Sequence, residues 1–194
     1  MRAAPVGSLL ALLGVLVLST CAVGACAPGP TPRASSRPAE SPGCVGAVEP
    51  PDGLKETDDP PLLAEAIRAP GKGGLCTAKV FQVVRPLTVY RVWSRDAPST
   101  RLGRWWSFGL PQGPVESYRA KNAICPEWSE LDMLVECKLK VGAEVVVGPG
   151  QSADCDGRDY AASATNQAYV PYDTRDSGQP VLHVGACTAG TTWP

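Results

Sequence analysis

The chain has little of what several large classes of protein require. It contains one histidine, His183, among 194 residues, and none of its eight cysteines stands in a Cys-x-x-Cys pair. The sequence therefore indicates no metal, zinc included, and no serine–histidine–acid triad. The formal net charge is -1 without a long basic run, which argues against the clustered basic face of a nucleic-acid-binding protein.

Long apolar runs are also missing, apart from one near the start of the chain. Residues 8–17 are mostly leucine and valine and follow Arg2. This run is much shorter than the ~20 apolar residues of a membrane-spanning helix. It is typical of the apolar region of a secretory signal, so we expect an exported protein.

Small residues precede a cysteine twice after this run, at Cys21 and at Cys26. Both sites resemble the bacterial lipoprotein signal, in which the cysteine becomes the acylated first residue of the mature chain. Cys26 is favoured because six cysteines follow it, an even number, and because Ala25 suits a cleavage site better than Thr20. We expect a protein of the bacterial cell envelope that a lipid at Cys26 anchors in the membrane. The alternative is ordinary secretion after cleavage near Ala25 or Ala27.

The composition divides the chain into three regions. Residues 1–25 form the lipoprotein-type signal peptide. Residues 26–43 are rich in proline, alanine and serine, so they predict an extended tether that buries no core. Residues 44–194 have the length of one globular domain.

Six cysteines fall in this globular region, and export predicts that they form disulfides. They are Cys44, Cys76, Cys125, Cys137, Cys155 and Cys187. Six cysteines can pair in many ways, and the sequence does not choose among them. The working prediction joins neighbours along the chain: Cys44 with Cys76, Cys125 with Cys137, and Cys155 with Cys187.

Strand patterns dominate the globular region. Residues 131–141 alternate apolar and polar side chains, and Gly142-Ala143 then suits a hairpin turn into 144–148. Other strands are expected over 76–84, 87–93, 104–108, 167–172 and 181–186, short helices over 62–69 and 114–123, and irregular chain over 148–164. The predicted class is α+β: one β-dominant domain with five or six mainly antiparallel strands, two short helices and up to three disulfides.

The stretch from Leu87 to Trp93 places an arginine among apolar side chains. A period of two puts Leu87, Val89, Arg91 and Trp93 on one face. A guanidinium cannot lose its proton, so Arg91 needs a partner, a ligand or a route to water. Two interpretations stay open. Arg91 reaches solvent or pairs with a carboxylate, or it binds an anion or a nucleotide at the floor of a cleft.

Three short motifs resemble those of the ADP-ribosyltransferase-like fold, which includes NAD-cleaving domains of secreted bacterial toxins. They are Tyr90-Arg91, Trp106-Ser107 and, on a later strand, Gln167. The resemblance implies NAD as substrate. It implies that Arg91, Tyr90 and Trp106 bind NAD, with the arginine on the diphosphate and the aromatic rings at the nicotinamide. Gln167 and Ser107 would be the catalytic residues.

Two functions of different classes remain open at this point. Transferases of this superfamily carry a glutamate in the third motif, where this chain has Gln167. The resemblance implies an NAD glycohydrolase or an ADP-ribosyltransferase, and the glutamine favours NAD hydrolysis, or binding without chemistry, over transfer to a protein. The other hypothesis is a non-catalytic cell-envelope lipoprotein that binds a partner through the same aromatic cleft. An enzyme would bring Arg91, Ser107 and Gln167 together on one concave pocket.

Overall fold

The computed structural model of the chain describes residues 43–173 and 181–194. These residues lie in one unit of the chain, Pro38–Pro194. The predicted signal peptide, Cys26 and the predicted tether up to residue 42 lie outside the described residues. Among the residues that are described, no helix is long and apolar enough to cross a membrane.

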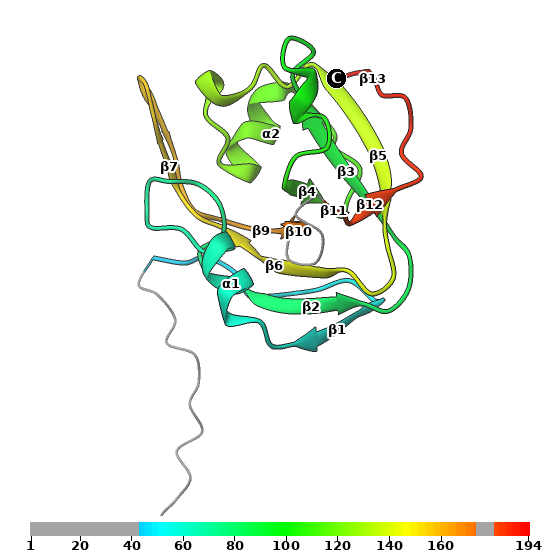
Figure 1. Cartoon of the computed structure of the whole chain (residues 1–194). Coiled ribbons are helices and arrows are strands. Elements are labelled where there is room, and N and C mark those ends of the chain that lie inside the picture. The colour runs from blue at the N-terminus through cyan, green and yellow to red at the C-terminus, as the bar shows by residue number, and fades with distance from the viewer. Residues whose placement is uncertain (1–42, 174–180) are drawn as a thin grey trace, which may run out of the picture. The chain divides into compact units, whose positions relative to one another are not determined.

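A curled antiparallel sheet dominates the domain (Figure 1). In spatial order its main strands are β1 (Leu54–Thr57), β2 (Lys79–Val83), β6 (Glu144–Gly150), β9 (Ser163–Tyr169), β4 (Trp105–Ser107), β3 (Leu87–Trp93), β5 (Met133–Leu139) and β12 (Val184–Gly185). A short strand, β13 (Thr191–Thr192), also pairs with β5. Two small sheets stand apart, β7 (Ala153–Cys155) with β8 (Arg158–Tyr160), and β10 (Tyr172–Asp173) with β11 (Val181–Leu182).

The longest pairing joins β3 and β5. It runs from Leu87 opposite Leu139 to Trp93 opposite Met133, and both strands are rich in the β-branched and apolar residues that suit a half-buried sheet. One face of the sheet carries the main core. Its members include Phe81, Val89, Trp93, Trp106, Val135, Leu139, Val145 and Val147.

Two helices cover parts of the other face. Helix α1 (Pro60–Ala66) begins after Asp59, whose Oδ1 accepts a hydrogen bond from the Leu62 amide at 2.9 Å. Its residues Leu62 and Ala66 pack against Val80 of β2 and against β6.

Helix α2 (Val115–Asn122) packs through Tyr118 against Val92 of β3. Ala123 ends this helix in the left-handed region, with φ of 48°. Two 3₁₀ turns, η1 (Pro98–Thr100) and η2 (Pro126–Trp128), lie in the connections that follow β3 and α2.

Three disulfides join the six cysteines of the domain. Cys44 pairs with Cys76, as predicted, but the other two predicted pairings are wrong. Cys125 pairs with Cys155, and Cys137 with Cys187. The reason is the sheet: β12 pairs with β5, so the chain that follows β12 brings Cys187 against Cys137. Three disulfides indicate an oxidising compartment.

The predicted fold class is confirmed, although the strands are more numerous than expected. The predicted helices and the strands at 87–93 and 131–141 are present, with ends that differ by a few residues. The prediction of irregular chain over 148–164 is wrong, since this segment holds the end of β6, the β7–β8 hairpin and the start of β9. Strand β1 is an addition that the sequence analysis did not predict.

Candidate functional site

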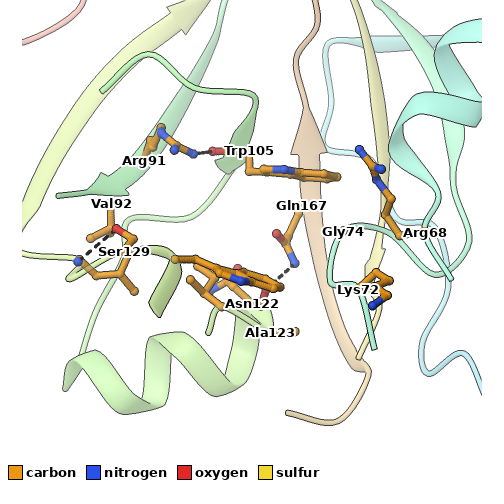
Figure 2. A pocket seen from close by; sticks show the side chains of 13 residues that line it. Arg68, Lys72, Gly74, Arg91, Val92, Trp105, Asn122, Ala123, Ser129 and Gln167 are labelled. Atoms are coloured by element: carbon orange, nitrogen blue, oxygen red, sulfur yellow. Dashed lines mark hydrogen bonds between the residues drawn. The ribbon is translucent and has the colours of Figure 1, made fainter. Parts of the chain in front are cut away.

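A pocket of about 240 Å³ lies where the two helices and the sheet meet (Figure 2). The loop after α1 forms one wall and the segment after α2 another, while β3, β4 and β9 supply the side chains between them. The lining residues are Arg68, Lys72, Gly74, Arg91, Val92, Trp105, Asn122, Ala123, Ile124, Trp128, Ser129, Leu131 and Gln167.

The lining is positively charged. Three basic residues, Arg68, Lys72 and Arg91, are among the lining residues, and none of the described residues that line the pocket is acidic. The four ion pairs among the described side chains involve other basic residues. The described lining therefore combines three basic residues with no acidic one.

Arg91 is fixed by backbone carbonyls. Its Nε donates to Thr100 O and its Nη1 to Trp105 O, both at 2.8 Å. Burial lowers the pKa of Arg91 from its ordinary value, with the neighbouring Tyr118 acting in the opposite direction. An arginine stays charged even so. Of the two interpretations left open by the sequence, the carboxylate pairing is absent among the described residues, and the arginine lines a pocket.

Gly103 lies directly against the guanidinium of Arg91. A Cβ on Gly103 would lie 2.6 Å from Nη2 of Arg91 and 2.7 Å from its Cζ. A side chain at Gly103 would therefore displace the guanidinium from its present position between β3 and the loop that precedes β4.

Two tryptophans line the pocket and both contact one glycine-rich turn. A Cβ on Gly73 would lie 3.0 Å from the Trp128 ring, and a Cβ on Gly74 would lie 3.3 Å from the Trp105 ring. Trp105 also meets the Tyr169 ring edge-on, with 4.9 Å between the ring centroids. Trp128 is 50% exposed, so the pocket has an aromatic side chain at its rim.

The glycine-rich turn itself is held by backbone hydrogen bonds. The Gly73 amide donates to Ser152 O at 2.8 Å, and the Gln151 amide donates to Gly74 O at 2.9 Å. Both Gly73 and Gly74 have positive φ, 63° and 77°, which glycine adopts without strain. The turn therefore presents Lys72 from a defined position.

The opposite wall depends on a buried arginine, Arg119 of α2, which is 5% exposed. Its guanidinium donates to four backbone carbonyls of the segment that follows the helix. The acceptors are Ile124 O at 3.5 Å, Cys125 O at 3.1 Å, Ser129 O at 2.6 Å and Glu130 O at 3.3 Å. Arg119 thus fixes the segment that carries Ile124, Trp128 and Ser129 into the pocket.

Gln167 enters the pocket from β9. It is 5% exposed, and its Nε2 donates to the backbone oxygen of Asn122 at 3.4 Å. Figure 2 shows this side chain pointing from the strand toward the end of α2. Gln167 and Arg91 are the two residues of the predicted site that line the pocket.

The other predicted residues lie close by without lining it. Tyr90 stands opposite Ser107 between β3 and β4, and Ser107 stands opposite Gln167 between β4 and β9. The Ser107 hydroxyl lies 3.2 Å from the hydroxyl of Tyr118, and burial raises the pKa of that tyrosine. Ser107 is therefore engaged with α2.

Trp106 lies on the opposite face of the sheet. It is 2% exposed, belongs to the main core, and donates from Nε1 to Gly103 O at 2.7 Å. Adjacent residues of a strand point to opposite faces. Trp105 therefore occupies the place in the pocket that the sequence analysis gave to Trp106.

Sequence reasoning missed Arg68, Lys72, Trp105, Asn122 and Trp128. The sequence does contain one pattern that could have indicated Lys72. This lysine stands between glycines in a Gly-Lys-Gly-Gly run, which the sequence analysis did not consider as part of a site. No local pattern connects this run to residues 122–128, which only the tertiary fold brings to the same pocket.

One group of described residues has metal-ligand spacing, formed by Cys125, Glu127 and Cys155. The two cysteines are joined in a disulfide and offer no thiolate. The disulfide of this group instead links the segment after α2, which forms a wall of the pocket, to the β7–β8 hairpin.

Comparison with family models, with curated proteins and with solved structures finds no match to this chain. The resemblance to the ADP-ribosyltransferase-like fold therefore stays a prediction, and the site is interpreted from its own chemistry.

Proposed function

We propose that this exported domain is a binding module, and that its pocket takes a small anionic ligand with a planar group. The observation that carries the proposal is one pocket whose described lining includes three basic residues, two tryptophans and no acidic residue. Arginine and lysine bind phosphate and carboxylate groups by charge-assisted hydrogen bonds, and indole rings offer flat apolar surfaces to a planar ligand.

The size of the pocket limits the ligand. Pockets for drug-sized molecules usually measure about 300–1,000 Å³. This pocket, at about 240 Å³, is slightly smaller. It suits a small anion, or one end of a larger molecule whose other end stays in solvent.

A titration followed by tryptophan fluorescence tests the proposal on the disulfide-bonded protein, exported into an oxidising compartment. Inorganic phosphate, ribose 5-phosphate and AMP form a series of increasing size. Lys72→Met should weaken AMP binding about tenfold, because a hydrogen bond to a charged group contributes about 1.5–3 kcal/mol. Lys55→Met on β1 is the matched control, an exposed lysine remote from the pocket lining. Equal effects of the two changes, or no binding by any member of the series, would refute the proposal.

A second candidate is NAD cleavage, by an NAD glycohydrolase or ADP-ribosyltransferase. It is favoured by the shared pocket of Arg91 and Gln167 and by the direct pairing of Ser107 with Gln167. In this hypothesis Arg91 holds the diphosphate, Trp105 stacks on the nicotinamide, and Gln167 positions the ribose hydroxyls. The volume requires the adenosine end of NAD to stay outside.

The release of nicotinamide from NAD tests this candidate. Gln167→Met should abolish the release, whereas Gln82→Met, the same change at an exposed position of β2, should not. If nicotinamide does not form although AMP binds, the protein is a binding module without this activity.

We also propose that a lipid at Cys26 anchors the protein in the bacterial cell envelope. Support comes from the small residues before Cys26 and from the six cysteines after it, which are all consumed by disulfides. Cys26→Ser should move the protein from the detergent phase to the aqueous phase in a partition assay, whereas Cys21→Ser should leave it in the detergent phase. An unchanged partition of the Cys26 variant would indicate plain secretion.

A further inference from the structure

Two side-chain amides in the pocket keep an open acceptor. Asn122 donates from Nδ2 to Tyr118 O at 2.9 Å, and Gln167 donates from Nε2 to Asn122 O. Neither Oδ1 of Asn122 nor Oε1 of Gln167 accepts a hydrogen bond from a described residue. Both residues are only 5% exposed. An acceptor in so buried a residue normally has a partner.

The space in front of these oxygens is the pocket. Two described side-chain atoms are fully enclosed without a partner, Nε1 of Trp93 and Nε of Arg101, and neither amide oxygen is among them. Each oxygen therefore remains accessible, and both residues line the pocket. In Figure 2 the Gln167 amide reaches into the space below Trp105, with one of its two terminal atoms bonded to Asn122.

One N–H of each amide donates to a backbone carbonyl, and this hydrogen bond fixes the orientation of the side chain. Turning either amide over would set its oxygen against the backbone oxygen of Tyr118 or Asn122, which is costly at buried positions. The pocket therefore offers acceptors at this end and cations at Arg68, Lys72 and Arg91. A matching ligand carries N–H donors on its planar part and negative charge elsewhere.

We infer that the ligand is a planar anion bearing an amino or carboxamide NH₂ group, which the side-chain oxygens of Gln167 and Asn122 recognise. This inference rests on the proposed function and specifies the ligand class for the same pocket. Nucleoside monophosphates with an amino-substituted base have this chemistry, and so does nicotinamide mononucleotide with its carboxamide.

Pairs of nucleotides that differ by NH₂ against a carbonyl oxygen test the inference. AMP should bind about tenfold more tightly than IMP, and CMP about tenfold more tightly than UMP, because the carbonyl places an acceptor against an acceptor and leaves the amide oxygens unpaired. Both members of each pair have the same phosphate and nearly the same size. Nicotinamide mononucleotide forms a third arm, which shows whether a carboxamide or a ring amine is preferred. Titration calorimetry on the exported, disulfide-bonded protein measures each affinity.

A variant separates recognition by the amide from other causes. Gln167→Met has nearly the same size and no amide, so it should reduce the preference for AMP over IMP toward unity. Gln82→Met should leave the preference unchanged. A thermal melt of each variant shows that it is folded, and the ligand pairs on the unmodified protein test the inference even if Gln167→Met does not fold.

The outcomes separate the two proposals. If no nucleotide, phosphate or sugar phosphate binds, the proposed function fails. If IMP and UMP bind as tightly as AMP and CMP, the pocket binds anions and the inference about NH₂ recognition is overturned. A preference that survives in Gln167→Met would also overturn it.

Discussion

Replacing Arg119 tests the idea that one buried guanidinium builds a wall of the pocket. The side chain donates to four carbonyls, of which Ser129 O at 2.6 Å and Cys125 O at 3.1 Å are the closest. Arg119→Met keeps most of the apolar stem and removes every donor. The two closest acceptors then lose their partner.

The expected loss follows from these two contacts. A hydrogen bond to a charged group contributes about 1.5–3 kcal/mol, so the loss of two should lower the free energy of unfolding of Arg119→Met by roughly 3–6 kcal/mol. Arg119→Lys should recover less than half of this, because an ammonium group lacks the planar fork that reaches several carbonyls at once.

Urea unfolding under non-reducing conditions, followed by tryptophan fluorescence, measures the loss. Arg85→Met is the matched control, since Arg85 is exposed and none of the described contacts involves its guanidinium. The reasoning is refuted if both variants unfold at the same urea concentration. It is also refuted if Arg119→Met is destabilised while its affinity for AMP is unchanged, because the wall would then not depend on the arginine.

Three further predictions concern the rest of the domain. Gly148→Ala should lower the melting temperature by many degrees, because the added Cβ would lie 2.0 Å from a backbone oxygen; an unchanged melting temperature would contradict the packing of β6. The hydroxyl of Tyr160 donates to Glu116 and lowers the pKa of this carboxyl, so the contact stabilises above the ordinary glutamate pKa of about 4.3 and is lost as the pH falls through the lower, folded value. Tyr160→Phe should raise that pKa toward the ordinary value in an NMR titration, and an unmoved pKa would show that the hydroxyl is not its main cause. Peptide mapping should recover Cys137 joined to Cys187, and replacing both by alanine should cost about 4 kcal/mol for a loop of this length; a peptide joining Cys137 elsewhere would contradict the pairing of β5 with β12.

The fold was predictable where the residue pattern is set by one buried face. The alternation over 131–141 and the apolar run at 87–93 predicted β5 and β3. The β7–β8 hairpin was not predictable in the same way, because Asp154 and Asp159 face each other across it and its outer residues are polar. Its position depends on the disulfide to Cys125, which no local pattern contains.

The candidate site was predictable in part for a similar reason. Arg91 stood out because a charge among apolar neighbours on a strand requires an explanation. Trp105 and Trp106 could not be told apart, since the sequence does not say which face of a three-residue strand meets the helices. Lys72 was missed because its place in the pocket is set by hydrogen bonds between the glycine-rich turn and residues 151–152.

Strand β9 has a consequence for how the pocket holds together. It is the strand that joins β1, β2 and β6 on one side to β4, β3 and β5 on the other. The glycine-rich turn with Lys72 bonds to residues 151–152, just after β6, whereas Arg91 belongs to β3 and Trp105 to β4. A ligand in contact with Lys72, Arg91 and Trp105 would connect the parts of the sheet that lie on the two sides of β9. Occupancy should therefore slow the opening of the domain at β9 and lengthen its lifetime against proteolysis, since binding to the folded state alone stabilises it by mass action.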